Sequence, residues 1–179
     1  MNKLLIVVDM QNDFITGSLG SPEAARIVPT VKAKIEAYRQ SGDTVLFTRD
    51  THGADYLETQ EGKYLPVIHC AAGTAGHQIS ATLHTSGCEI LDKASFGSLA
   101  LADYVAAGNY EEIELCGLCT DICVVSNAII LKARLPETKI SVDADCCAGV
   151  TAENHKAALL TMKSCQVNIL NHVHSEYVL

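Results

Sequence analysis

Short apolar runs alternate along this chain with segments of helical periodicity. The apolar runs are rich in Val, Ile and Leu, and we predict them to be strands over residues 4–9, 44–49, 89–91, 113–116, 140–143 and 167–170. The segments with apolar residues at helical spacing, which we predict to be helices, cover residues 22–40, 78–86, 98–107, 121–135 and 152–164. Buried strands that alternate with helices imply right-handed crossovers. We therefore predict an α/β fold with three α/β/α layers around a six-stranded, mostly parallel sheet.

Residues 50–79 interrupt this alternation with a long irregular stretch between the second predicted strand and the next helix. Its polar side chains include those of Asp50, His52, Glu61 and His69. Loops of this length inside a compact domain are usually functional or disordered. The histidines favour function.

Length and hydropathy restrict the class of protein. The chain has 179 residues, 48% of them hydrophobic, and its mean hydropathy is +0.17. This length suits one domain over residues 1–179, and the composition is too apolar for a disordered protein. No apolar run approaches the ~20 residues of a membrane-spanning helix. The high apolar share suggests that part of the surface is buried in a homo-oligomer.

Charge and the first residues indicate the partners and the compartment. The formal net charge is −8, with 13 Lys and Arg scattered among 21 Asp and Glu. Without a basic cluster, this distribution argues against a nucleic-acid partner. Met1, Asn2 and Lys3 lead directly into the first apolar run, without the cleavage site or the length of a signal peptide. We expect a cytoplasmic protein whose partner is a small molecule, with no membrane association.

The eight cysteines do not have the spacing of a zinc ribbon or a thioredoxin-like site. The apolar content is sufficient for folding without cross-links, so we expect reduced thiols. Cys119 and Cys123 form CxxxC, not CxxC, while Cys146 and Cys147 are adjacent and cannot easily bind one metal together. A thiol redox or metal-binding protein that uses Cys119 and Cys123 is still a rival interpretation.

Four reactive side chains follow successive predicted strands. Asp9 ends the first strand, Asp50 follows the second, Lys93 follows the third, and Cys123 opens the helix after the fourth. The carboxyl ends of parallel strands form the binding crevice of open α/β sheets. A single Asp after a strand is usually a turn or cap residue, but four such residues favour one common site.

Cys123 lies where an apolar strand pattern has ended at glycine and a helical pattern begins. We expect this junction to present the thiol to solvent, with Thr120 or Asp121 as the N-cap of the helix. The unpaired N–H groups of a helix start favour a thiolate and can bind an oxyanion, which suggests nucleophilic catalysis. The alternative is that Cys123 is a small buried hydrophobic residue.

Asp50 and His52 are two residues apart, so they face the same side of an extended segment, and His69 can reach them from the long loop. One carboxylate and two imidazoles, with open positions for water, suit Zn²⁺, Fe²⁺ or Mn²⁺. The alternative is that the two histidines only form hydrogen bonds within the loop.

Five motifs, taken together and in this order, resemble the isochorismatase-like cysteine hydrolase family and, within it, the nicotinamidase branch. The resemblance covers essentially the whole chain. The motifs are Val8-Asp9-Met10-Gln11-Asn12-Asp13-Phe14 with Gly17-Ser18-Leu19, Thr48-Arg49-Asp50-Thr51-His52, His69-Cys70 with Gly73-Thr74-Ala75-Gly76, Lys93 before Ser95-Phe96, and Gly117-Leu118-Cys119-Thr120-Asp121-Ile122-Cys123-Val124.

The resemblance implies a catalytic triad of Asp9, Lys93 and Cys123. Lys93 and the helix start would lower the pKa of Cys123, and Asp9 would take the thiol proton and pass it to the leaving ammonia. The resemblance also implies a cis peptide bond between Leu118 and Cys119. The N–H groups of Cys119 and Cys123 would then form the oxyanion hole.

The resemblance likewise implies a divalent metal that binds the pyridine nitrogen of the substrate, with Zn as first choice and Fe or Mn as alternatives. Asp50, His52 and His69 would hold it. The fourth protein ligand differs among nicotinamidases; Glu61 is our candidate here, and Glu58 is the second.

Three aromatic residues are candidates for substrate binding. Phe14 could stack on a flat ring, and Tyr64 or Phe96 could close the other side, although each could equally pack in the core or in a lid. Many nicotinamidases have a tryptophan just before the metal-binding His, whereas this chain has none and has Ile68 before His69.

We predict a cysteine amidohydrolase that cleaves a small carboxamide through a thioester, with nicotinamide to nicotinate plus ammonia as first choice. The enzymatic alternative is an N-carbamoyl or ureido amidohydrolase that uses the same triad without pyridine coordination. Cys123 argues against vinyl-ether hydrolysis, because the isochorismatases proper lack this nucleophile.

Overall fold

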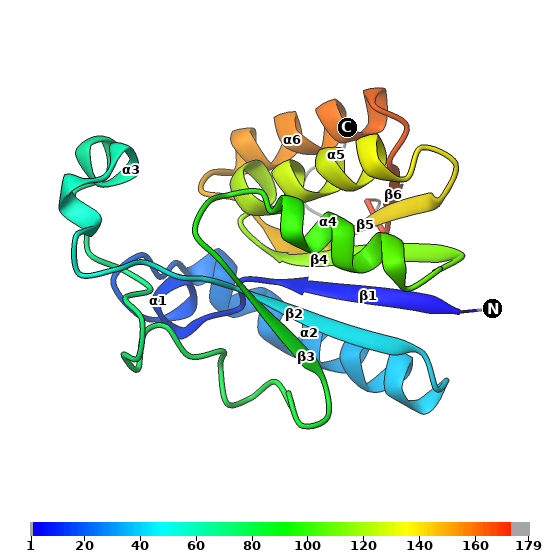
Figure 1. Cartoon of the computed structure of the whole chain (residues 1–179), viewed down its shortest axis with the longest axis horizontal. Helices are drawn as coiled ribbons and strands as arrows, with labels where there is room; N and C mark the ends of the chain where they lie inside the picture. The colour runs from blue at the N-terminus through cyan, green and yellow to red at the C-terminus, as the bar shows by residue number, and fades with distance from the viewer. Residues whose placement is uncertain (1, 173–179) are drawn as a thin grey trace.

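The computed structural model of the protein describes residues 2–172 and has a central sheet of six parallel strands (Figure 1). The strand order is β3-β2-β1-β4-β5-β6. The strands are β1 (Lys3–Val8), β2 (Thr44–Asp50), β3 (Glu89–Lys93), β4 (Glu112–Leu118), β5 (Lys139–Ala148) and β6 (Asn168–Leu170). The predicted six-stranded parallel sheet is therefore confirmed.

Helices cover both faces of the sheet. The helix α2 lies on one face, against β1, β2, β4 and β5, while α4, α5 and α6 lie on the other (Figure 1). Their bounds are α2 (Pro22–Gln40), α4 (Leu99–Ala107), α5 (Val125–Arg134) and α6 (Ala152–Ser164). Within the described residues, no helix is both long and apolar enough to cross a membrane.

One predicted helix is wrong, because residues 78–86 form turns. Their backbone groups bond to the segment after β1: the N–H of Ser80 donates to the carbonyl of Met10, and the N–H of Asn12 donates to that of Gln78. Backbone N–H and C=O groups whose hydrogen bonds are made with a distant segment do not require the hydrogen bonds of a local helix. The Ser and Thr residues of this segment also favour turns.

Short helices that the sequence did not predict lie near the carboxyl end of the sheet. They are α1 (Asn12–Ile15), the 3₁₀ helix η1 (Tyr56–Glu58) and α3 (Gln60–Tyr64). The pair η1 and α3 forms an arm that projects from the sheet (Figure 1).

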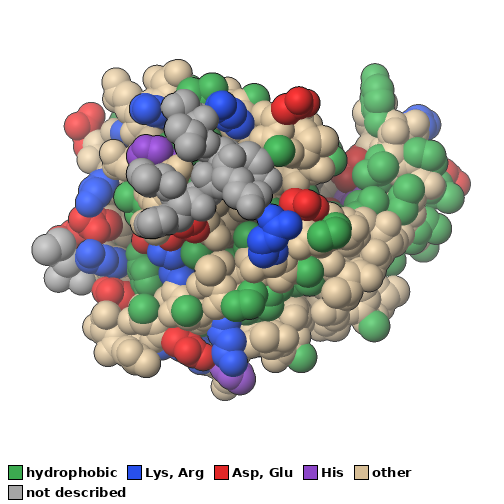
Figure 2. All heavy atoms as spheres, turned by 180° about the vertical axis from the view of Figure 1, so that it is seen from behind, with side chains coloured by type: hydrophobic (Ala, Val, Ile, Leu, Met, Phe, Trp, Pro, Cys, Tyr) green, Lys and Arg blue, Asp and Glu red, His purple; other side chains and the backbone are tan. Residues whose placement is uncertain are grey.

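Hydrophobic side chains gather on the outer side of this arm (Figure 2). Leu57 and Tyr64 of the arm are exposed, as is Ile68, which follows it in the chain. The homo-oligomer expected from the composition stays a prediction.

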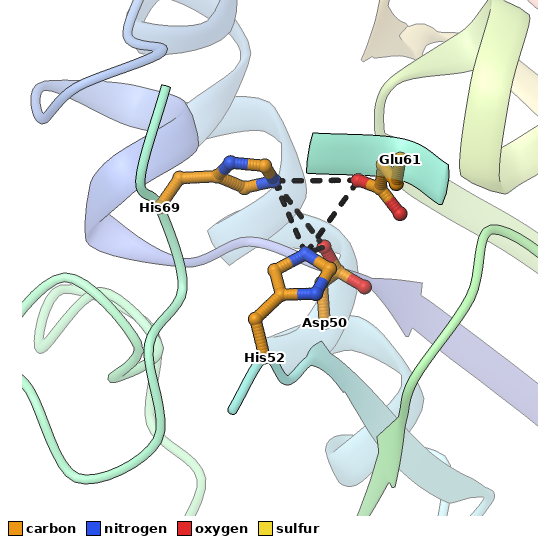
Figure 3. A group of neighbouring side chains, drawn as sticks. All are labelled: Asp50, His52, Glu61 and His69. Carbon is orange, nitrogen blue, oxygen red and sulfur yellow. Dashed lines mark hydrogen bonds and ion pairs between the residues drawn. The ribbon is translucent and has the colours of Figure 1, made fainter. Parts of the chain in front are cut away.

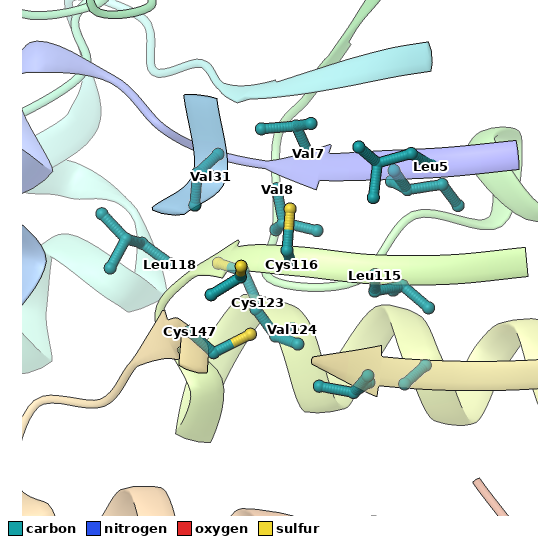
Figure 4. Packing of buried hydrophobic residues seen from close by; sticks show 14 of the residues in the cluster. Leu5, Val7, Val8, Val31, Leu115, Cys116, Leu118, Cys123, Val124 and Cys147 are labelled. Carbon is teal, nitrogen blue, oxygen red and sulfur yellow. The ribbon is translucent and has the colours of Figure 1, made fainter. Parts of the chain in front are cut away.

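The strand β1 lies at the centre of the sheet, and residues 4–8 have no exposed surface. A strand that is covered on both faces needs a continuous apolar run instead of alternation, which explains the pattern at the start of the chain. Around it, Val31 of α2 packs on one face and Leu115 of β4 belongs to the same buried cluster (Figure 4).

The parallel direction of the strands brings four segments to one edge of the sheet. Asp50 and Lys93 are register partners at the ends of β2 and β3. Asp9 follows β1, and β4 leads into η2 (Thr120–Val124), a π-helical turn that continues as α5 and contains Cys123. The predicted convergence of reactive side chains is thus a result of strand direction.

Gly117 allows β4 to pass close to β1 just before this edge. Its φ is +117°, and a Cβ there would lie 2.1 Å from the carbonyl oxygen of Val8. A side chain is therefore excluded both by the backbone conformation and by contact with a backbone atom.

We predict that Gly117→Ala lowers the free energy of unfolding by about 3 kcal/mol. The cost of placing alanine at a positive φ adds to the cost of the collision between its Cβ and the carbonyl oxygen of Val8. The matched control is Gly42→Ala, since Gly42 also has a positive φ, +75°, but no atom within 4 Å of the added Cβ. That control should cost about 1 kcal/mol. Urea unfolding measures both values, and equal losses would contradict the close approach of β1 and β4.

Candidate active site

A buried lysine links the other two predicted catalytic side chains and one predicted metal ligand. The Nζ atom of Lys93 lies 2.6 Å from Oδ2 of Asp9 and 3.4 Å from Sγ of Cys123. It also lies 3.2 Å from Oδ1 of Asp50 and donates to the carbonyl of Ser95 at 3.1 Å. All of the groups predicted for the triad therefore meet around one ammonium.

Asp9 is held in place by a residue that the sequence analysis did not single out. The hydroxyl of Thr48 donates to Oδ1 of Asp9 at 2.6 Å, and the N–H of Asp9 donates back to the same hydroxyl at 3.2 Å. Asp9 has a φ of +48°, a left-handed conformation that turns the chain out of β1. Thr48 is the first residue of the motif that contains Asp50 and His52, and this position is the sequence feature that could have identified it.

The thiol of Cys123 is buried, with 4% of the residue exposed, so the expectation of a solvent-facing thiol is wrong. Burial, reinforced by the charge of Asp9, raises the pKa of Cys123 well above its ordinary value, even though Lys93 acts in the opposite direction. Lys93 thus lowers this pKa as expected, but burial outweighs its effect. At neutral pH the resting form is the thiol.

Burial also changes the proton affinity of the two neighbours. It raises the pKa of Asp9, although Lys93 opposes this change. Burial would lower the pKa of Lys93, but the charges of Asp9 and Asp50 and the hydrogen bond to Asp9 outweigh it and raise that pKa. Lys93 thus stays an ammonium, while Asp9 becomes a stronger base that can accept a thiol proton.

Four side chains next to the triad could hold a metal ion (Figure 3). One ligand atom each from Asp50, His52, Glu61 and His69 lies within 4.8 Å of the others. Nε2 of His52 is 2.8 Å from Oδ2 of Asp50 and 3.2 Å from Nε2 of His69. Both histidine nitrogens are 3.6 Å from Oε1 of Glu61. Two imidazoles and two carboxylates are a donor set that suits a divalent metal.

The surroundings of these side chains direct one histidine toward the cluster and keep Asp50 ionised. Nδ1 of His69 lies 2.8 Å from the carbonyl oxygen of Val67, which directs Nε2 toward the cluster. Burial alone would raise the pKa of Asp50, but the hydrogen bond from His69 and the charges of Lys93 and His52 hold it at about 2. Asp50 is therefore ionised, as a metal ligand must be.

The arm formed by η1 and α3 supplies Glu61. Tyr56 is buried at its base, where its ring lies 4.5 Å from that of His52 and 5.1 Å from that of His69. The hydroxyl of Thr59 accepts a hydrogen bond from the N–H of Gly62 and so caps α3. Glu58, the second candidate for the fourth ligand, is exposed on η1 and lies outside the cluster.

Gln11 is a further residue that the sequence analysis did not single out. Its Nε2 donates to the carbonyl of Asp50 at 2.8 Å, and its Oε1 accepts from the N–H of Asp50 at 2.7 Å. This buried amide fixes the backbone of the residue that touches both Lys93 and the metal cluster.

A cavity of about 490 Å³ reaches one residue of the triad and three of the metal cluster. Cys123, Asp50 and His69 line it together with the predicted aromatic residues Phe14 and Phe96. Tyr64 does not line it, and 83% of this residue is exposed. The structure thus brings two of the three aromatic candidates to the cavity.

Cys119 lies at the start of η2 and also lines the cavity. The peptide bond between Leu118 and Cys119 is cis, as expected. Burial raises the pKa of Cys119 to about 12, and all eight cysteines, which lie within residues 2–172, are free. A protonated thiol is a poor redox partner, which weakens the interpretation of Cys119 and Cys123 as a redox pair.

Comparison with known proteins relates this geometry to a family. A relative from Mycobacterium tuberculosis, named nicotinamidase/pyrazinamidase, is 27% identical over 188 residues, covering 94% of this chain and 98% of the relative. A structure of a Pyrococcus horikoshii pyrazinamidase in complex with zinc has a TM-score of 0.84 and 26% identity, over 95% of this chain and 99% of that chain. A structure of an N-carbamoylsarcosine amidase from Thermoplasma acidophilum has a TM-score of 0.82 and 26% identity. The match covers 98% of this chain and 99% of that chain.

The family model described as the isochorismatase domain matches residues 3–173. This match covers nearly the whole chain, including both the triad and the metal cluster. The protein therefore belongs to the isochorismatase domain family.

Proposed function

We propose that the protein is a cysteine amidohydrolase that cleaves a small carboxamide, with nicotinamide as substrate and nicotinate and ammonia as products. The observation that carries the proposal is the contact of one buried ammonium, that of Lys93, with both Asp9 and Cys123 at the cavity. A base, a thiol and a fixed positive charge within contact distance are what acyl transfer to sulfur needs.

The first half of the reaction forms a thioester. As Sγ of Cys123 attacks the amide carbonyl, its proton passes to the carboxylate of Asp9. The N–H groups of Cys119 and Cys123 donate to the oxyanion of the tetrahedral intermediate. When the C–N bond breaks, Asp9 returns the proton to the leaving nitrogen and ammonia departs.

The second half hydrolyses the thioester. Asp9 takes a proton from water, whose oxygen attacks the acyl carbon, and the C–S bond breaks. The sulfur leaves as a thiolate beside the Lys93 ammonium and regains its proton from Asp9. The sum is one amide and one water converted to one carboxylic acid and one ammonia.

Asp50, His52, Glu61 and His69 would hold a divalent metal, with zinc as first choice and Fe or Mn as alternatives. A bound metal supplies a Lewis acid to which the ring nitrogen of a pyridine carboxamide can bind. Phe14 and Phe96 line the cavity, where their rings can pack against a flat ring of the substrate. This arrangement supports an aromatic substrate. The names of the mycobacterial and archaeal relatives support the same substrate class.

An N-carbamoyl amidohydrolase is the second candidate. It would use Asp9, Lys93 and Cys123 in the same roles, and the likeness to the Thermoplasma N-carbamoylsarcosine amidase favours it. Its substrate has no ring nitrogen, so dependence on the metal separates the two candidates.

We predict that Cys123→Ala lowers ammonia release from nicotinamide by at least about a thousandfold, because it removes the thiol that contacts Lys93. The matched control is Cys165→Ala, since Cys165 is exposed at the end of α6 and should leave the rate unchanged. Circular dichroism checks that both variants fold. Substantial activity in Cys123→Ala would exclude this nucleophile, and a wild-type protein inactive on nicotinamide would exclude this substrate.

We predict that Lys93→Met shifts the alkylation of Cys123 by iodoacetamide to higher pH. The pKa of the thiol is already raised by burial, so the thiolate fraction at neutral pH is small and grows as the pH rises. Removal of the ammonium raises that pKa further and slows alkylation at each pH. Lys163→Met, at an exposed position of α6, is the control. Identical pH profiles for Lys93→Met and the wild type would show that Lys93 does not stabilise the thiolate.

We predict that Glu61→Gln weakens zinc binding by about tenfold or more, measured by competition with a chelator, while Glu58→Gln has no effect. Both changes remove one carboxylate from the same arm, but only Glu61 reaches the cluster.

Metal removal should slow hydrolysis of nicotinamide far more than that of benzamide, which lacks the ring nitrogen. Equal rates on both amides, unchanged by metal removal, would favour the N-carbamoyl alternative.

A further inference from the structure

Asn127 is a buried amide on α5, about one turn after Cys123, with 1% of the residue exposed. Its Nδ2 donates to the carbonyl oxygen of Cys123 at 2.8 Å and to that of Phe96 at 3.0 Å. Its Oδ1 accepts from the N–H of Ser98 at 3.0 Å. Because both donors meet acceptors and the acceptor meets a donor, the amide can take only one orientation.

These bonds join the helix of the nucleophile to the loop between β3 and α4. The loop starts after Lys93, whose ammonium donates to the carbonyl of Ser95. It ends at Ser98, the N-cap of α4, whose hydroxyl accepts from the N–H of Leu101. Between these two points lies Phe96, which lines the cavity. Both ends of the loop thus have other anchors, whereas Asn127 ties its middle to the helix.

Close packing holds the same loop against α5. A Cβ on Gly97 would lie 2.5 Å from Cδ1 of Ile130 and 3.3 Å from Cβ of Ser126. The packing leaves no space between loop and helix, and the three directional bonds of Asn127 determine where along the helix the loop lies.

We propose that Asn127 is a positioning residue that sets the Phe96 wall of the cavity relative to the sulfur of Cys123, and thereby favours substrates with a flat ring. One NH₂ group binds the backbone carbonyls of both residues, so the separation of those two backbones depends on it. The inference rests on the proposed function in one respect, because it takes Cys123 as the nucleophile.

The test compares alkylation of Cys123 by iodoacetamide and by its N-phenyl derivative, iodoacetanilide, at mildly alkaline pH. Mass spectrometry of the Cys123 peptide gives each rate constant. Both reagents form the same S–CH₂ bond and release iodide, so the ratio of anilide to amide rates reports how the cavity receives a ring. Phe96→Ala should lower this ratio by about threefold to tenfold, the range expected for one aromatic contact.

Asn127→Asp keeps the shape of the side chain and the acceptor for Ser98, but places an oxygen against two carbonyl oxygens. It should lower the ratio about as much as Phe96→Ala does, and the double variant should show no further loss, because both changes act through one contact. Asn154→Asp, at an exposed position of α6, is the matched control and should leave the ratio unchanged.

A second variant keeps the test valid if Asn127→Asp does not fold. In Asn127→Thr the hydroxyl can still bond the carbonyl of Cys123, four residues earlier, but cannot reach the loop as the amide does. It should lower the ratio in the same way.

An unchanged ratio, equal slowing of both reagents, or losses that multiply in the double variant would each overturn the role of Asn127. A wild-type Cys123 that neither reagent labels would overturn the proposed nucleophile, and this role with it.

Discussion

The ammonium of Lys93 is buried, and a charge in a protein interior is costly unless opposite charges and hydrogen bonds surround it. Its partners are the carboxylates of Asp9 and Asp50 and the carbonyl of Ser95, and it also touches the sulfur of Cys123. These groups come from the ends of β1 and β2, the loop after β3, and η2. One charge therefore holds together four segments that meet at the carboxyl edge of the sheet.

The same burial determines the chemistry of the nucleophile. In the proposed mechanism, a thiol with a raised pKa does not start as a thiolate, so its proton leaves as the sulfur attacks. Asp9 suits this step, because burial raises its pKa while the hydrogen bond from Thr48 fixes its direction. The proposed role of Lys93 is then to stabilise negative charge as it develops on the sulfur during the reaction.

Asp50 connects the triad with the candidate metal cluster, since one oxygen faces Lys93 and the other faces His52 and His69. Gln11 fixes its backbone from both sides. The position of the cluster relative to the nucleophile is therefore set by a short chain of buried contacts. Such rigidity is what a site needs if it is to hold a ring nitrogen and an amide carbonyl at a fixed separation.

The sequence by itself determined the layered fold and the meeting of Asp9, Asp50, Lys93 and Cys123. The reason is that apolar runs and helical periodicity are local signals, and parallel strands end at a common edge. The motifs also indicated Asp50, His52 and His69 as candidate metal ligands, whereas Glu61, which lies in none of them, was only a candidate for the fourth ligand.

Only the tertiary structure decided how deeply Cys123 is buried, and hence the direction of its pKa shift, because desolvation depends on segments far away in the chain. It also decided that residues 78–86 form turns, since their hydrogen-bond partners lie beside β1. The exposure of Tyr64 and the loop bonds of Asn127 have the same origin. Local patterns specify which elements form, whereas burial and polar pairing between distant segments exist only once those elements have packed.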